Sequence, residues 1–395
     1  MERLYDKLKA YSESDFYAFH MPGHKRNKTL LGIELPYDLD ITEIDGFDDL
    51  HHADGILKEE QERAARVFGA EESHFLVNGS TAGILSAVMG CTHRGDKILV
   101  ARHCHKSIYH AIYMNGLVPR YVYPEFDISM HMNGEISKED VAKALAAEPD
   151  IKAVVIVSPN YDGVVSDVKG IAEVAHSYRI PLIVDEAHGP HFGFHPAFPG
   201  RANDLGADVV INSLHKTLPS LTQTAILHIN GKLANRRRIK KYLDMLQSSS
   251  PSYIFMASLD ACVDFLDGKC EEAFELYVER LQKFREELKP LQHLQILRTE
   301  HYDISKVVIS TANANITSPE LADRLRKEYH LEMEMTGGTY VLAMTTVADT
   351  QEGLDRLKSA LLEIDDQLEA KTAVSGSIEI SGELPRLEQY FTPQE

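Results

Sequence analysis

The chain has 395 residues, of which 44% are hydrophobic, so it is long enough to form two or more packed structural units. Its 41 lysines and arginines against 60 aspartates and glutamates give a net charge of −19. An acidic surface repels phosphate backbones and anionic lipids, which argues against nucleic acid or a membrane as the main partner. The four cysteines lack zinc-ligand spacing, which favours a reduced, cytoplasmic protein without a metal site.

The first 50 residues are expected to form an irregular N-terminal arm. They begin with a short amphipathic segment that is too charged for a signal peptide, and continue through HMPGHKRN into a stretch rich in Pro and Asp. Gly and Pro in this region favour turns over a continuous helix. A helical pattern, ILKEEQERAARVF, then begins after Gly55, and Gly69 is expected to end it.

Residues 51–250 are expected to form a large α/β domain. Helical segments such as EDVAKALAAE and DVKGIAEVAHSY alternate with short apolar runs that predict strands. The predicted strands are residues 97–101, 120–124, 153–158, 181–186, 208–213 and 224–229. Apolar strands separated by crossover helices indicate a mainly parallel sheet that is buried on both faces.

Residues 251–395 are expected to form a helical linker and a smaller α+β domain. Long helices are predicted over residues 233–246 and 271–291. A strand (KVVIS), a helix (SPELADRLRKEY), two strands (LEMEM and TYVLAMTT) and a helix (QEGLDRLKSALLEI) follow over residues 305–370. The final ~20 residues are expected to be a loose tail.

Two residues that follow predicted strands suggest the chemistry. Lys216 ends the segment SLHK (213–216), which directly follows the apolar run DVVIN, and an amine with a lowered pKa in such a place can form a Schiff base. Asp185 ends the strand PLIVD at the carboxyl edge of the sheet, where α/β proteins bind ligands. Its carboxylate can pair with a protonated pyridine nitrogen. Taken singly, Lys216 is also explained as a surface charge and Asp185 as a helix cap.

Small and hydroxyl residues predict a phosphate site. Gly79, Ser80 and Thr81 in NGSTAG precede a helical run, and free N–H groups at a helix N-terminus attract anions. Ser213 and His215, beside the lysine, can also donate to a phosphate. The alternative explanation of NGSTAG is an ordinary Ser/Thr helix cap.

Two histidines complete the pattern. His105 follows the strand KILVA and can stack on an aromatic ring, although a loop histidine without a special role explains it equally. His188 lies three residues after Asp185, within reach of the ring or the substrate. The order of phosphate site, stacking residue, carboxylate and lysine matches pyridoxal phosphate (PLP) enzymes of the aspartate aminotransferase fold, fold type I.

Within that fold, the chain resembles the bacterial ornithine/lysine/arginine decarboxylases, in a short form without the N-terminal wing domain. The segments that carry the resemblance are HMPGHK (20–25), DITEIDGFDDLH (40–51), NGSTAG (78–83), HCHKS (103–107), YDG (161–163), DEAHG (185–189) and SLHK (213–216). The resemblance implies that PLP is the cofactor. It also implies the roles of the individual residues: Lys216 as the Schiff base, Asp185 on the pyridine nitrogen, His105 stacked on the ring, His188 near the PLP hydroxyl and the substrate carboxylate, and Ser80, Thr81, Ser213 and His215 on the phosphate.

The resemblance also implies a substrate pocket bordered by His24 and Tyr161. A lysine, ornithine or arginine substrate ends in a cation and needs a carboxylate, for which Glu332 and Glu334 of LEMEM are candidates. Acids on an exposed strand face explain these two residues equally well. The fold further implies a homodimer or a higher homo-oligomer, with the active site at the interface between subunits.

Decarboxylation is favoured by a missing arginine. Aminotransferases of this fold hold the substrate's α-carboxylate with a small-domain arginine, yet residues 337–350 contain none. Arg324 and Arg326 lie on a charged helix and are expected to be solvated. The proton donor to the α-carbon is expected to be Lys216 or His188. The alternatives are an aminotransferase, a β-lyase, an amino acid oxidase or a non-catalytic protein of the same fold.

Overall fold

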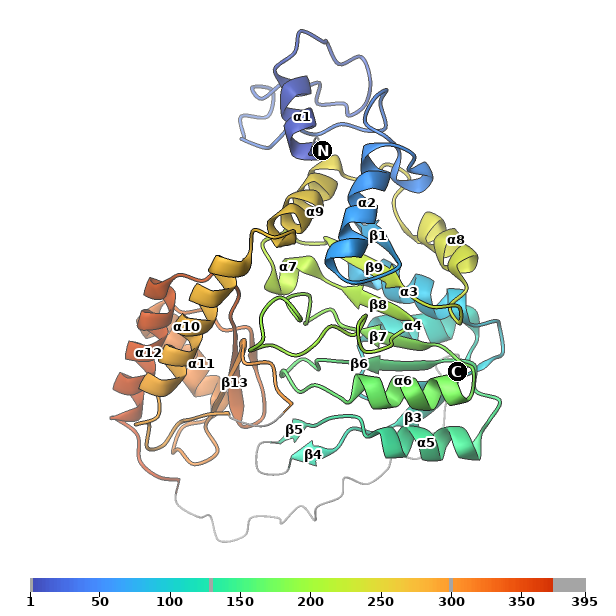
Figure 1. Cartoon of the computed structure of the whole chain (residues 1–395). Coiled ribbons are helices and arrows are strands. Elements are labelled where there is room, and N and C mark those ends of the chain that lie inside the picture. The colour runs from blue at the N-terminus through green and yellow to red at the C-terminus, as the bar shows by residue number, and fades with distance from the viewer. Residues whose placement is uncertain (1–2, 128–130, 298–300, 372–395) are drawn as a thin grey trace.

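The computed structural model describes residues 3–127, 131–297 and 301–371 (Figure 1). The predicted loose tail, the final ~20 residues, lies outside the described residues. Within the described parts of the chain, no helix is long and apolar enough to cross a membrane.

A seven-stranded sheet forms the centre of the molecule, in the order β1-β9-β8-β7-β6-β2-β3 (Figure 1). Its strands are β1 (Glu72–Leu76), β2 (Lys97–Ala101), β3 (Val118–Val122), β6 (Val154–Val157), β7 (Leu182–Asp185), β8 (Val209–Asn212) and β9 (Ala225–Ile229). From β3 to β8 all neighbours are parallel, whereas β9 runs antiparallel to both β8 and β1. The predicted mainly parallel sheet is therefore confirmed, and β1 is the strand that the sequence pattern did not predict.

Helices cover both faces of this sheet, which explains why its central strands are apolar throughout. α3 (Gly79–Cys91), α4 (Lys106–Asn115) and α8 (Arg236–Leu246) pack on one face. α5 (Lys138–Ala147) and α6 (Val168–Ser177) pack on the other face. Every residue of β6, β7 and β8 is consequently buried. A separate two-stranded sheet, β4 (Phe126–Asp127) with β5 (Met132–Asn133), lies near α5.

A smaller antiparallel sheet has the order β10-β11-β13-β12. Its strands are β10 (Gln295–Ile296), β11 (Lys306–Ser310), β12 (Met335–Thr336) and β13 (Tyr340–Met344), and the helices packed against it are α10 (Glu271–Glu287), α11 (Ser318–Tyr329) and α12 (Gln351–Asp365). The predicted α+β unit is confirmed in this arrangement. The strand predicted over LEMEM is largely wrong, because α11 ends in a left-handed turn at His330 and ladder pairing begins only at Met335.

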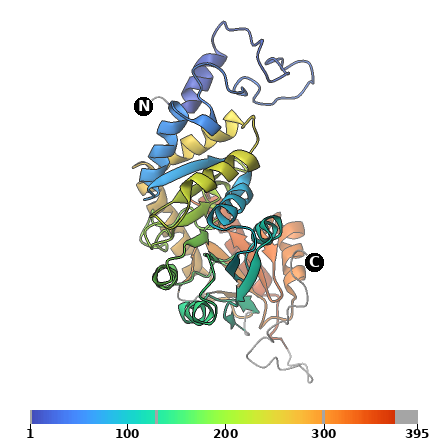
Figure 2. The same ribbon diagram turned by 90° about the vertical axis from the view of Figure 1, so that its right-hand side faces the viewer.

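The N-terminal arm projects from one end of the molecule (Figures 1 and 2). α1 (Leu4–Ser12) is followed by mostly irregular chain as far as the short helix η1 (Leu50–His52). α1 buries Leu4 and Leu8 beside α9 (Tyr253–Leu266) and α2 (Ile56–Val67). α2 ends just before Gly69, whose φ of 68° gives the left-handed residue expected after a helix.

Candidate functional site

Lys216 lies in the one-turn helix α7 (Leu214–Thr217), directly after β8. Its Nζ atom is 2.8 Å from Nε2 of His188, which follows the neighbouring strand β7. Burial lowers the pKa of the Lys216 amine, and the charges of Asp185 and Glu334 oppose that shift. An amine whose pKa is lowered spends more of its time neutral, which is the form that attacks a carbonyl group.

Asp185 is the last residue of β7 and is 3% exposed. Its Oδ1 atom accepts a hydrogen bond from the backbone N–H of Ala187 at 3.2 Å. Burial raises the pKa of this carboxyl, and the positive charge of Lys216 lowers it. A buried carboxylate is costly without a cationic partner, so this position suits a protonated ring nitrogen.

The N-terminus of α3 has the features of an anion site. Its N-cap residue, Asn78, makes no side-chain capping bond, so the first-turn N–H groups of Ser80 and Thr81 are not capped by a side chain of their own helix. Gly79, with φ of 71°, donates its N–H to the carbonyl of Gln223 at 2.9 Å, which ties this turn to the loop after Lys216. Ser213 Oγ is buried and has no hydrogen-bond partner within the described chain. An unpartnered buried hydroxyl and an uncapped helix start fit a phosphate group.

The two remaining histidines of the predicted cofactor site are held by specific contacts. His105 is the N-cap of α4, and its Nδ1 accepts from the N–H of Ser107 at 3.3 Å, which fixes the ring. His215 Nδ1 lies 2.8 Å from the carbonyl of Thr224 and must therefore donate to it. His215 can then donate to a phosphate only as a cation, because its Nε2 carries the second proton. Burial lowers the pKa of both histidines, so His215 needs the anion itself to favour that charge.

Of the predicted substrate residues, Tyr161 and Glu334 lie beside Lys216 and His188. The hydroxyl of Tyr161 donates to the carboxylate of Glu334, and the Tyr161 and His188 rings are 4.7 Å apart between centroids. The charge of Glu334 opposes the lowering of the Lys216 pKa. Glu332 acts instead on Arg326, whose pKa it helps to raise after the larger effect of Asp323.

His24 lies elsewhere, in the N-terminal arm. Its Nε2 is 3.2 Å from Asp40, and its ring stacks on Tyr37 with centroids 4.5 Å apart. None of these partners belongs to the group around Lys216. Arg326 is exposed, as expected, and pairs with Asp323 on its own helix, whereas the Arg324 side chain is only 25% exposed and pairs with Glu328.

Comparisons with known proteins identify the family. A family model described as "Orn/Lys/Arg decarboxylase, major domain" matches residues 3–315. This chain belongs to the Orn/Lys/Arg decarboxylase family. An arginine decarboxylase of Bacillus subtilis is 34% identical over 392 residues, which cover 95% of this chain and 80% of that protein. The constitutive lysine decarboxylase of Escherichia coli is 27% identical over 315 residues, or 72% of this chain and 43% of that protein.

Solved structures of other proteins share the fold. The lysine decarboxylase of Francisella novicida superposes with a TM-score of 0.80 at 20% identity, covering 92% of this chain and 60% of that one. An alanine–glyoxylate aminotransferase of Nostoc superposes less closely, with a TM-score of 0.63 at 16% identity. This chain thus spans about 60% of the length of the solved lysine decarboxylase. PLP is the cofactor of the family, and membership favours an amino acid decarboxylase over the aminotransferase, lyase, oxidase and non-catalytic alternatives.

Lys306 is a residue of the site that the sequence reasoning missed. It opens β11, is fully buried, and places its Nζ atom 2.9 Å from Nδ1 of His188. Burial lowers its pKa to about 8, although Asp303 opposes the shift. The signal in the sequence was a lysine at the head of the apolar strand KVVIS, in a position read only as a strand start.

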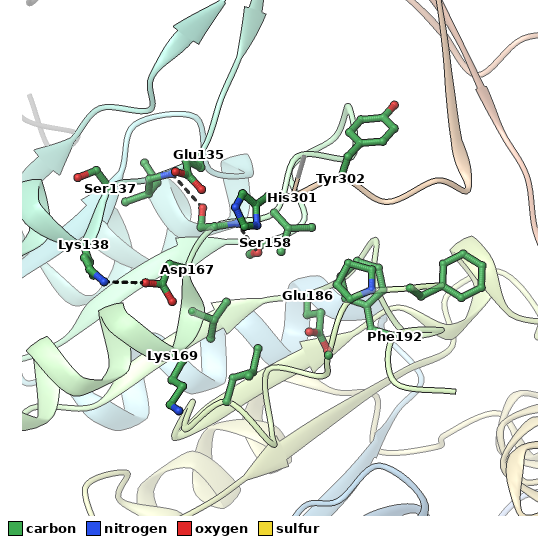
Figure 3. A pocket seen from close by; sticks show the side chains of 18 of the residues that line it. Glu135, Ser137, Lys138, Ser158, Asp167, Lys169, Glu186, Phe192, His301 and Tyr302 are labelled. Atoms are coloured by element: carbon green, nitrogen blue, oxygen red, sulfur yellow. Dashed lines mark hydrogen bonds and ion pairs between the residues drawn. The ribbon is translucent and has the colours of Figure 1, made fainter. Parts of the chain in front are cut away.

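A separate cavity of about 670 Å³ lies beside Glu186, the residue that follows Asp185 (Figure 3). Glu186 borders it and accepts hydrogen bonds from the N–H of Ala202 at 2.9 Å and from Asn212 Nδ2 at 3.0 Å. Burial raises the pKa of Glu186 to about 8. The cavity wall also carries the ion pair of Lys138 and Asp167, at 3.3 Å, but none of the residues predicted to hold the cofactor.

Proposed function

We propose that this protein decarboxylates a basic amino acid, with arginine as the first candidate, and releases the corresponding amine of the polyamine type. The observation that carries the proposal is the hydrogen bond from Tyr161 to the carboxylate of Glu334, because the Tyr161 ring lies against His188, the neighbour of Lys216. The cationic end of an arginine, ornithine or lysine substrate needs such a carboxylate. The arginine decarboxylases among the relatives favour arginine over the other two.

The residues at the sheet edge fit PLP. Lys216 would hold it covalently, Asp185 would pair with its ring nitrogen, and His105 would stack on its ring. The phosphate would be held by the start of α3 and by the residues before the lysine, namely Gly79, Ser80, Thr81, Ser213 and His215. When bound, PLP supplies the electron-withdrawing group that lets a bond to the substrate's α-carbon break.

The protein's own residues would decide which bond breaks. Residues 337–350 supply no arginine, and Arg324 and Arg326 are paired at the surface. The α-carboxylate would therefore not be held by a bidentate arginine, which favours its loss as carbon dioxide. Glu334 and Tyr161 would bind the far cationic end, and His188 would border the reacting carbon.

We also propose three units and a homodimer or higher oligomer whose active sites include residues of both subunits. The units are the arm (1–50), the large domain (51–250) and the remainder (251–395). The arm supports the dimer because it exposes large apolar side chains that a lone subunit leaves in water. These side chains are Phe16, Tyr17, Phe19, Met21, Leu30, Leu31, Ile33 and Leu35. His24 lies in this arm and would act in the partner's site. The four free thiols suit a cytoplasmic location.

Product analysis tests the reaction. The PLP-loaded protein is incubated with arginine, ornithine, lysine and neutral amino acids, with Lys216→Ala as the control, and products are identified by mass spectrometry. We expect one amine, made from a basic amino acid and dependent on Lys216. A keto acid, pyruvate or peroxide would contradict decarboxylation.

Subunit mixing tests the shared site. Inactive Lys216→Ala and His24→Ala proteins are dissociated, mixed and reassociated. If His24 serves the partner's site, each mixed dimer regains one complete site, so activity returns to about a quarter of the wild-type value. If the mixture stays inactive, His24 does not act across the interface.

A further inference from the structure

The imidazole of His188 lies between two lysine amines. Its Nε2 atom is 2.8 Å from Lys216 Nζ, and its Nδ1 atom is 2.9 Å from Lys306 Nζ. Lys216 comes from the edge of the seven-stranded sheet, whereas Lys306 comes from the four-stranded sheet. His188 is 6% exposed and Lys306 is fully buried, and both contacts are too short for a water molecule to lie between the nitrogen atoms.

The hydrogen-bonding capacity of His188 limits the total charge on His188, Lys216 and Lys306. Burial and the two lysine charges hold the pKa of His188 well below its usual range, so the ring is neutral. A neutral imidazole has one N–H donor and one acceptor nitrogen. Only one lysine can therefore donate to it as an ammonium, and the other must accept from it as a neutral amine. The two lysines share a single proton between them in this arrangement.

The side chain of Lys306 is closely packed and surrounded by charged groups. Gly163, with φ of 108°, lies against its side chain, and a Cβ there would be 2.7 Å from Lys306 Cγ. The YDG sequence thus leaves a slot for this lysine. Other ionisable groups that face Lys306 come from several elements: Asp303 before β11, Asp162 in the YDG turn, Glu334 before β12, and Lys216 of α7. Asp303 is itself fully buried and contacts His191 at 3.1 Å, so a fixed negative charge lies near the amine.

We propose that Lys306 supplies a proton to Lys216 through His188, so that Lys216 can protonate the substrate's α-carbon. This inference rests on the proposed decarboxylation. Lys306 gives its proton to Nδ1, His188 gives the proton on Nε2 to Lys216, and Lys216 passes a proton to the α-carbon. The electron pair of the broken bond to carbon dioxide forms the new C–H bond. This leaves Lys306 neutral and His188 protonated on Nδ1. After product release, Lys216 takes one proton from solvent and passes it to Nε2, while Nδ1 returns its proton to Lys306, which restores the starting state in each turnover.

Two substitutions separate proton supply from positioning. Lys306→Met removes the amine, whereas Lys306→Arg keeps a permanent charge that can orient His188 but cannot give up its proton. Lys327→Met, on the exposed face of α11, is the matched control. Circular dichroism and thermal melting establish folding. If Lys306→Met does not fold, Lys306→Arg and the wild-type protein still carry the test.

The first readout uses the cofactor-free protein. Lys216 is acetylated competitively over a range of pH, and its modification is followed by peptide mass spectrometry. Loss of the shared second amine in Lys306→Met should move the midpoint of Lys216 reactivity upward by about one pH unit or more, and Lys306→Arg should not raise it. An unchanged midpoint in Lys306→Met would mean that the two amines do not share a proton.

The second readout is turnover by the PLP-loaded protein. Both Lys306 variants should lose at least about tenfold in kcat, with a smaller change in KM, while Lys327→Met keeps wild-type activity. Wild-type kcat in Lys306→Arg would overturn proton delivery by Lys306. If the wild-type protein makes no amine from any basic amino acid, the proposed function fails, and the labelling midpoint still reports separately on the shared proton.

Discussion

The carboxyl edge of the seven-stranded sheet and the four-stranded sheet supply different kinds of residues to one site. Asp185 ends a strand of the large sheet, and Ser213 and Lys216 follow the next strand, at the edge where parallel strands bind ligands. Lys306 is the first residue of a strand of the small sheet, and Glu334 comes just before another. The first group is positioned by local connectivity alone. The position of the second group depends on how the two sheets pack. The two lysines of the site, Lys216 and Lys306, therefore cannot be found by one sequence pattern.

The strongest test of the large-sheet group is Lys216→Ala. We expect kcat to fall at least about a thousandfold and the absorbance of lysine-bound cofactor to disappear, because covalent attachment is lost. Absorbance spectra and amine production measure the two effects. Near wild-type activity in this variant would remove Lys216 from the centre of the site.

The matched test of the small-sheet group compares Glu334→Gln with Glu332→Gln. Loss of the Glu334 charge should raise KM for a basic substrate about tenfold to a hundredfold, with kcat changed less. Glu332→Gln should leave KM unchanged, because Glu332 faces Arg326 instead. Steady-state kinetics with arginine measure both. Equal effects of the two variants would contradict the separate placement of these acids.

A stability test examines the contact between the two groups. Gly163→Ala places a Cβ against Lys306 at a backbone φ of 108°, so we expect a loss of about 2–4 kcal/mol in the free energy of unfolding. Gly268→Ala is the control: its φ of 72° is also positive, but nothing lies within 4 Å of the added Cβ. We expect about 1 kcal/mol there. Denaturant unfolding compares them, and equal losses would show that Lys306 does not fill the slot.

The smallest expected effect is on the pH dependence of stability, and it comes from Glu186, the neighbour of Asp185. Burial raises the pKa of Glu186 from 4.5 to about 8, so between these values the folded protein holds a proton that the unfolded chain releases. Its contribution therefore destabilises the fold progressively as pH rises from about 4.5 to 8. Glu186→Gln should flatten this dependence by about 1–3 kcal/mol. Chemical unfolding at pH 5 and pH 8 measures it; an unchanged slope would contradict a neutral Glu186.

The sequence predicted the large sheet well because its strands are continuous apolar runs and its helices are periodic. Each of the six predicted strands overlaps an observed strand, and the helix predicted over SPELADRLRKEY matches α11. β1 escaped prediction because its five residues include Glu72, Ser73 and His74. LEMEM alternates as a strand should, yet only Met335 pairs, since pairing depends on a partner that local pattern does not reveal.

The residues of the site were also predictable to different degrees. Residues that follow strands within one α/β unit were predictable from position, including Asp185, His188 and Lys216. Lys306 was not, because a lysine at a strand start is ordinarily a surface residue, and its burial arises from a contact 118 residues away in the chain. His24 shows the opposite limit: its motif was recognisable, but it lies in a part of the arm that leaves several large apolar side chains exposed, away from Lys216.

The contact between His188 and Lys306 joins the two sheets through one pair of nitrogen atoms at 2.9 Å. Any change in how the two sheets pack would therefore change the length of this contact, and with it the proton path that we propose.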